Sequence, residues 1–324
     1  MNQSDQFSTS DQEFTVVVLP DTQFYCDTRL KLSKQWGNGD LREYFSKQTR
    51  WVRENRERLN IVFLLHEGDI VQTDHPDEWE IARDAMSILD GSVPYCMCLG
   101  DHDMGFKENH QSKYGGEKAT NRNTEFNKFF PLEKFSARKE FGGTFESGVH
   151  DNSWYHFESG GMKFMVVSLE YYPRNEVLDW ANDLVSSHPE YRVIVLTHAY
   201  LKREETREVE EVKIQGNHGE DLWQKLIRKH QNIFLVLCGH HYGEASLTSV
   251  GDHGNQVYQL LSDYQHLNDG GESWLRYMVF RPKDNKISIY TYNPVLDMYQ
   301  DGPLSRFDLP YTMLGKSSQT RTLS

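Results

Sequence analysis

Five short apolar segments of this chain each end directly before residues that can bind a metal ion. Residues 14–19 are followed by Pro20-Asp21, and residues 61–65 lead into Gly68-Asp69. The other three segments, with the residues that follow them, are 95–99 before Gly100-Asp101-His102-Asp103, 192–196 before Thr197-His198, and 233–237 before Cys238-Gly239-His240. Runs of Val, Ile, Leu and Phe that stop at Gly, Pro or Asp are typical of buried strands. The sequence therefore predicts strands whose carboxyl ends carry acidic and imidazole groups.

Helical patterns separate these strands. Apolar residues recur at three- and four-residue spacing in residues 41–59, 77–89, 176–186 and 219–229, which indicates amphipathic helices. Alternating strands and helices are typical of parallel sheets covered by helices, and ligands bind such sheets beyond the carboxyl ends of the strands. After residue 154, turns rich in Gly, Asp and Asn separate further strand-like segments, which favours antiparallel or mixed pairing. These segments are 154–157, 163–169, 245–250, 256–261, 275–281 and 286–292.

The length of 324 residues allows one or two domains. The order of the motifs favours a single domain over residues 14–312, with polar, flexible tails at residues 1–13 and 315–324. Residues 105–153 are expected to form an irregular excursion from this domain. A connection of that length beside a site commonly serves as a lid or a binding wall.

Charge and cysteine content limit the partners and the compartment. The 48 acidic residues exceed the 35 basic ones, giving a net charge of −13, which argues against a nucleic-acid partner. We see neither a signal peptide nor an apolar stretch of membrane-spanning length, and four cysteines are too few for a disulfide framework. We therefore expect a cytoplasmic protein with no membrane partner, although a mature domain with a trimmed export signal would have the same composition.

The polar residues after the strands suit a pair of divalent ions. Two ions about 3.5–4 Å apart need a bridging carboxylate and further ligands from several directions, and separate strand ends can supply them. In this order the motifs resemble those of calcineurin-like metallophosphoesterases, and Pro20-Asp21-Thr22-Gln23 is similar to the opening of one subgroup. The motifs that carry the resemblance are Asp21-Thr22-Gln23, Gly68-Asp69, Gly100-Asp101-His102-Asp103, His198 and Gly239-His240.

The resemblance implies a fold and a set of roles. The expected fold is a four-layer α/β/β/α sandwich of two facing mixed sheets. Asp21 would bind the first metal, Asp69 would bridge both metals, and His198 and His240 would bind the second. The expected cofactors are two divalent ions, Mn or Fe/Zn rather than Mg, because imidazoles take part.

Two further residues receive catalytic roles from the same resemblance. His102 would stabilise or protonate the leaving oxygen, a task suited to a side chain that titrates near neutral pH. Asp103 would orient the turn or the imidazole.

Three positions differ from the common family pattern. Gln23 stands where a histidine is usual, and its amide either binds the first metal weakly or bonds the neighbouring backbone. Asp101 replaces an asparagine ligand of the second metal, which should tighten that site. Tyr242 replaces the last histidine, so that ligand is the phenol, or His241 in a shifted register, or absent; a packed aromatic is the simpler interpretation of Tyr242. Because Gln23 and Tyr242 both belong to the first metal, we expect that site to be weakened.

The resulting hypothesis is hydrolysis of a phosphoester by metal-activated water, on a small-molecule or polymer substrate. One alternative is a weakly active or silent relative that keeps the fold and binds metal or phosphate. The other is a nuclease of the same superfamily, against which the acidic balance counts.

Overall fold

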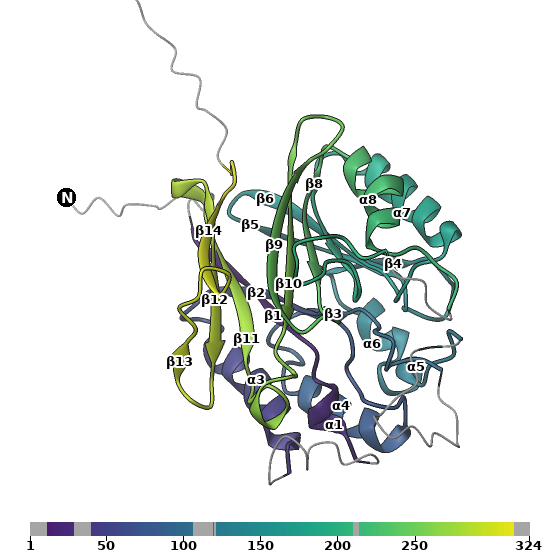
Figure 1. The fold of residues 1–324 in the computed structure, drawn as a ribbon, viewed down its shortest axis with the longest axis vertical. Helices are drawn as coiled ribbons and strands as arrows, with labels where there is room; N and C mark the ends of the chain where they lie inside the picture. Colours follow the sequence, from purple (N-terminus) through teal and green to yellow (C-terminus); the bar gives the residue numbers. More distant parts are fainter. Residues whose placement is uncertain (1–11, 29–39, 106–118, 120, 210–213, 314–324) are drawn as a thin grey trace, which may run out of the picture.

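The computed structural model describes residues 12–28, 40–105, 119, 121–209 and 214–313. Two seven-stranded mixed sheets face each other, and helices cover their outer faces (Figure 1). This confirms the predicted α/β/β/α sandwich. The expected flexible tails lie almost entirely outside the described residues. Within the described residues, none of the helices has the length and apolar character needed to cross a bilayer.

The first sheet has the strand order β13-β12-β11-β1-β2-β3, with β14 paired to β12. Three of its strands run parallel: β1 (Phe14–Leu19), β2 (Ile61–His66) and β3 (Tyr95–Met97). The antiparallel part consists of β11 (Leu275–Arg281), β12 (Lys286–Asn293), β13 (Met298–Tyr299) and β14 (Arg306–Pro310). The parallel strands therefore present three carboxyl ends at one edge, as the sequence predicts.

The second sheet has the order β4-β5-β6-β7-β8-β10-β9. Four adjacent strands of this sheet run parallel to one another: β6 (Met162–Ser168), β7 (Arg192–Leu196), β8 (Ile233–Cys238) and β10 (Gln256–Asp263). The remaining strands are β4 (Phe141–Thr144), β5 (Ser153–Ser159) and β9 (Gly243–Val250). Since β10 is parallel to β8, its carboxyl end reaches the same edge as the end of β8.

Four helices occur where the apolar spacing predicts them: α3 (Arg42–Glu54), α4 (Pro76–Ser87), α7 (Asn175–Ser187) and α8 (Gly219–Lys225). Three of them end earlier than predicted, α4 by only two residues. At the end of α3, Asn55 bonds back to the Trp51 carbonyl at 2.8 Å, and after α8 the backbone of Leu226 leaves the helical region before the short 3-10 helix η2 (Ile227–Lys229).

Two apolar clusters hold the layers together. One fills the space between the sheets and extends under α3 and α4, and the other lies between the second sheet and α7 and α8. The buried residues include whole strands, since every residue of β1 and β8 is buried. Burying one large aliphatic or aromatic side chain contributes about 1.5–3 kcal/mol. The strands that carry the polar loops are therefore firmly anchored.

The described part of the predicted excursion at residues 105–153 contains regular structure. It includes α5 (Phe126–Phe129), α6 (Leu132–Ser136) and β4. Phe126 and Phe135 are fully buried there. Thr124 donates a hydrogen bond to the Asp103 carbonyl at 2.7 Å, so this segment packs directly against the loop after β3.

Candidate metal centre

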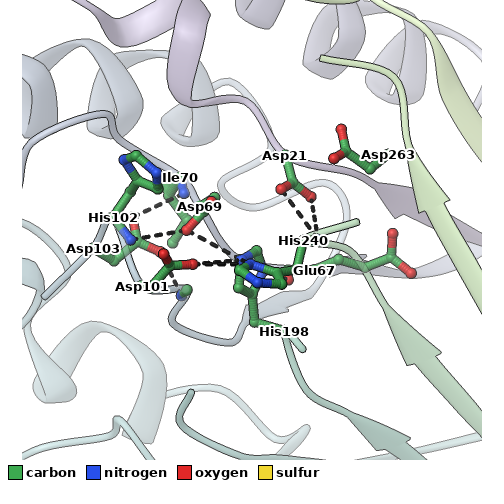
Figure 2. A network of polar contacts seen from close by, with 12 residues as sticks. Asp21, Glu67, Asp69, Ile70, Asp101, His102, Asp103, His198, His240 and Asp263 are labelled. Carbon is green, nitrogen blue, oxygen red and sulfur yellow. Dashed lines mark hydrogen bonds and ion pairs between the residues drawn. The ribbon is translucent and has the colours of Figure 1, made fainter. Parts of the chain in front are cut away.

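Four side chains from four different strand ends converge at the shared edge of the sheets (Figure 2). They are Asp69, Asp101, His198 and His240, and one ligand atom from each lies within 4.8 Å of the others. His198 Nε2 is 3.2 Å from Asp69 Oδ1 and 3.4 Å from Asp101 Oδ1. His240 Nδ1 is 3.0 Å from Asp101 Oδ1 and 3.2 Å from His198 Nε2.

This spacing fits a divalent metal ion. Ligand atoms about 2.1 Å from an ion at tetrahedral angles are about 3.4 Å apart, close to the distances between these four atoms. Asp101 Oδ1 is buried and, among the described residues, receives no hydrogen bond of good geometry. Two carboxylates with two imidazoles are a donor set that Mn, Fe and Zn accept. The residues present therefore fit a metal ion.

Backbone geometry brings these carboxylates close to their neighbours. A side chain at Gly100 would overlap the Asp69 carboxylate, and one at Gly239 would overlap that of Asp21. Asp69 and His240 both adopt positive φ angles, of 47° and 71°, which is unusual for residues other than glycine and concentrates at functional sites.

The tautomer of His198 is set by the backbone. Its Nδ1 donates to the Glu67 carbonyl at 2.8 Å, which leaves Nε2 directed at Asp69 and Asp101. Such a bond to the nitrogen that does not face the metal is a common feature of metal-binding histidines.

Burial and the neighbouring charges shift the pKa values of Asp101 and His198 in opposite directions. Burial raises the pKa of Asp101, but His240 and His198 outweigh it and lower that pKa well below its usual value. Burial lowers the pKa of His198, but Asp69 and Asp21 outweigh it and raise that pKa well above its usual value. Without metal the His198 imidazole therefore holds a proton that a metal ion would replace.

His102 lies at the rim of this group and is half-buried. Its backbone N–H donates to Asp69 Oδ1 at 3.0 Å, and its Nδ1 donates to the Gln72 carbonyl at 2.8 Å. Burial lowers the pKa of the imidazole, but Asp69 and Asp101 outweigh it and raise the pKa. The imidazole can therefore be protonated near neutral pH, with Nε2 as its second donor.

The Asp103 carboxylate accepts hydrogen bonds from backbone N–H groups rather than from an imidazole. One oxygen accepts the N–H groups of Ile70 and Val71 at 2.8 and 2.9 Å, and the other accepts that of Gly100 at 2.8 Å. Burial and the Asp69 charge raise the pKa of Asp103 to about 8, and the three N–H groups oppose that rise. Of its two expected roles, orienting the turn is the one that these contacts support.

Asp21 lies beside the four-residue group rather than within it. The His240 backbone N–H approaches its two oxygens at 3.4 and 3.3 Å. Gln23, in the short helix α1 (Gln23–Cys26), is buried, and its Oε1 has no hydrogen-bond partner within the described ranges. Its carbonyl oxygen therefore does not bond the neighbouring backbone there.

The structure does not bring Tyr242 together with these residues. Its side chain is 52% exposed and stacks on His266, with ring centroids 5.5 Å apart. His241 turns instead toward Glu208, with 3.4 Å between Nε2 and Oε1. Neither side chain forms a hydrogen bond or an ion pair with Asp21 or Asp69 in the part of the chain that the structure describes.

Sequence reasoning missed Glu208. This carboxylate is fully buried and forms a second group with His240 and His241, again with ligand atoms within 4.8 Å. Burial raises its pKa, but the two histidines outweigh that effect and lower it to about 2. The signal available was weak: Glu208 belongs to a charged run after His198 that favours a solvated loop.

Two more buried carboxylates lie near Asp21. Asp263 ends β10, and Glu67 follows β2 and accepts a hydrogen bond from Ser262 at 2.7 Å. Figure 2 shows both on the side of the histidines away from His102. Burial raises the pKa of both carboxyl groups, and that of Asp263 reaches about 7. Burial is also the largest cause of the raised pKa of Asp21, and the charge of Asp263 is the second largest. The sequence offered no motif for either.

Comparison with known proteins agrees with this geometry. Residues 14–244 match the profile of the calcineurin-like phosphoesterases. The chain belongs to this family. The family and the four-residue group together support metal-dependent hydrolysis of phosphoesters as the general class of reaction.

Two similar proteins can be named. The uncharacterized protein YvnB of Bacillus subtilis is 27% identical over 305 residues, which cover 90% of this chain but 20% of YvnB. The chain therefore spans only about a fifth of this relative. A purple acid phosphatase from yellow lupin superposes with a TM-score of 0.56 at 11% identity, over 94% of this chain and 55% of the lupin protein. That likeness concerns the fold.

Proposed function

We propose that this chain hydrolyses a phosphoester at a site for two divalent metal ions, with water as the nucleophile. The observation that carries the proposal is the meeting of four ligand atoms, from Asp69, Asp101, His198 and His240, beside the donor His102. Asp69 is the proposed bridge, and Asp21 and Gln23 are proposed for the first metal. When bound, such ions polarise a phosphoryl oxygen and generate hydroxide near neutral pH.

His102 is the proposed general acid. Its Nδ1 bond to the Gln72 carbonyl fixes the ring, and Asp69 and Asp101 favour the charged form. The Nε2 proton is then available to a leaving oxygen. A positioned general acid typically contributes about 10²–10⁴ in rate.

The remaining assignments are proposals as well. We favour Mn or Fe/Zn at the imidazole pair, and a small-molecule or polymer phosphoester as substrate. Four buried cysteines without disulfide partners support a reducing compartment such as the cytoplasm. Tyr242 is the weakest ligand candidate, because it is exposed and stacked on His266.

One observation favours a second candidate function. The outward position of Tyr242 and the lack of an imidazole at Gln23 would weaken the first metal, and a protein with only the second metal could bind phosphate with little turnover. This candidate predicts one firmly bound ion per chain and no metal-stimulated hydrolysis.

The test is hydrolysis of p-nitrophenyl phosphate and bis-p-nitrophenyl phosphate by protein stripped with a chelator and reloaded with Mn, Fe, Zn or Mg. We expect metal-stimulated turnover that falls to background in Asp69→Asn, because the proposed bridge is lost. Asp301→Asn is the control, since its side chain is 81% exposed and its polar partner in the described structure is the exposed Arg306. Wild-type activity in Asp69→Asn would refute the two-metal mechanism, and metal-loaded protein without turnover would favour the second candidate.

A further inference from the structure

The first metal has lost both of the imidazoles that the family pattern supplies. Gln23 and Tyr242 occupy those positions, and Tyr242 is 52% exposed. His241 cannot substitute in this arrangement, because its ring faces Glu208. A cation near Asp21 therefore needs a ligand from outside the five motifs.

Topology brings one such group to the correct edge. Strand β10 is parallel to β8, and Leu261 is aligned with Cys238. Asp263 follows Leu261 by two residues, as His240 follows Cys238, so both emerge at the shared carboxyl edge. Figure 2 shows the Asp263 carboxylate beside that of Asp21.

Asp263 is held in place rather than loosely buried. Its Oδ1 accepts the backbone N–H of Gln265 at 2.9 Å, and its Oδ2 accepts the Gln265 side-chain amide at 3.2 Å. Each oxygen keeps a second lone pair. Bonds of this kind orient carboxylates that bind metals.

Two buried amide oxygens on residues near Asp21 and Asp263 lack donors. Gln23 Oε1, two residues after Asp21, and Gln265 Oε1, on the residue that holds Asp263, are buried without a hydrogen-bond partner among the residues described. A buried acceptor left unpaired destabilises the folded protein. Arg276 is no substitute for a cation here, because its guanidinium is bound to Glu244 at 2.7 Å. A hydrated cation would satisfy such acceptors directly or through its waters.

We propose that Asp263 replaces the missing last histidine, so that the first metal is bound by oxygen alone, from Asp21, Asp69, Asp263 and the amide of Gln23. This inference rests on the proposed function. Ligand sets made only of oxygen suit Mg²⁺ and Mn²⁺, whereas imidazoles suit Zn²⁺ and Fe²⁺. The two sites therefore differ in preference, with Mg²⁺ or Mn²⁺ at the first and Mn, Fe or Zn at the second. Our sequence-based expectation disfavoured Mg at both.

The competing interpretation is that Asp263 is a buried neutral acid with a purely structural role. It would then keep its proton, fill space between β10 and the first sheet, and have no effect on metal content. Asparagine would replace it with the same shape and the same number of bound ions.

The experiment measures bound Mn²⁺ per chain by elemental analysis after equilibrium dialysis, for wild type, Asp263→Asn and Glu67→Gln. Glu67→Gln is the matched control, because Glu67 is equally buried in the same place but is not a proposed ligand. We expect two ions in wild type and Glu67→Gln, and one in Asp263→Asn. Electron paramagnetic resonance should show a spin-coupled pair in the first two and an isolated Mn²⁺ in the third.

Magnesium gives an independent readout. We expect Mg²⁺ to raise the melting temperature of wild type, and the concentration needed to increase at least about tenfold in Asp263→Asn. Should Asp263→Asn fail to fold, Asp263→His decides the matter: two sites remain, and stabilisation by Mg²⁺ is exchanged for stabilisation by Zn²⁺.

The outcomes separate the inference from the proposed function. Two ions in both wild type and Asp263→Asn would overturn the role of Asp263 and leave the two-metal function intact. A single ion in both would remove the first site and with it this inference. Wild type that binds no ion would overturn the proposed function itself.

Discussion

Asp103 offers a prediction whose size follows directly from its contacts. Asp103→Ala removes the acceptor of three buried backbone N–H groups, those of Ile70, Val71 and Gly100. Each unpaired N–H costs about 1–3 kcal/mol, and neighbours in one network do not add fully. We expect the free energy of unfolding to fall by about 4 kcal/mol. Asp103→Asn keeps one acceptor oxygen and should lose about half as much.

The assay is urea unfolding in the presence of a chelator, followed by circular dichroism and fluorescence. Asp301→Ala serves as the exposed control and should stay within about 0.5 kcal/mol of wild type. A loss below about 1 kcal/mol for Asp103→Ala would refute the claim that this carboxylate holds the loops after β2 and β3 together.

Three further predictions concern the metal centre. His102→Asn should lower kcat by about 10²–10⁴ without changing the metal content, because its proton and not its metal affinity is lost; unchanged kcat would exclude it as the acid. Mn²⁺ affinity, measured by calorimetry, should be higher at pH 8 than at pH 6: Asp69 and Asp21 raise the pKa of His198 despite burial, so binding must displace a proton at the lower pH. Equal affinities would contradict that coupling. Glu208→Gln should weaken Zn²⁺ binding about 10–100-fold, since its charge supports His240, and an unchanged dissociation constant would leave Glu208 without that role.

Local pattern was enough to predict the strands and most of the residues at their ends. The run at 61–65 is apolar and β-branched and stops at a glycine, so both β2 and the position of Asp69 follow from local chemistry. The same holds for Asp101 after β3 and His198 after β7. Their order along the chain then indicated a shared edge.

Asp263 and Glu208 could not be found in this way. The strand before Asp263 has the same local character as an antiparallel one, and only its pairing with β8 brings Asp263 to the site. Glu208 lies in a charged run, and its burial depends on the packing of His240 and His241 around it. Both cases depend on contacts between segments distant in sequence, which periodicity does not encode.

The central claim is that Asp69, Asp101, His198 and His240 surround one metal ion. Anomalous diffraction from crystals grown with Mn²⁺ and phosphate tests this most directly. The expected result is a strong anomalous peak within bonding distance of Asp69 Oδ1, Asp101 Oδ1, His198 Nε2 and His240 Nδ1. A fully loaded crystal with no peak among these four atoms would contradict the assignment of this chain as a metal-dependent hydrolase.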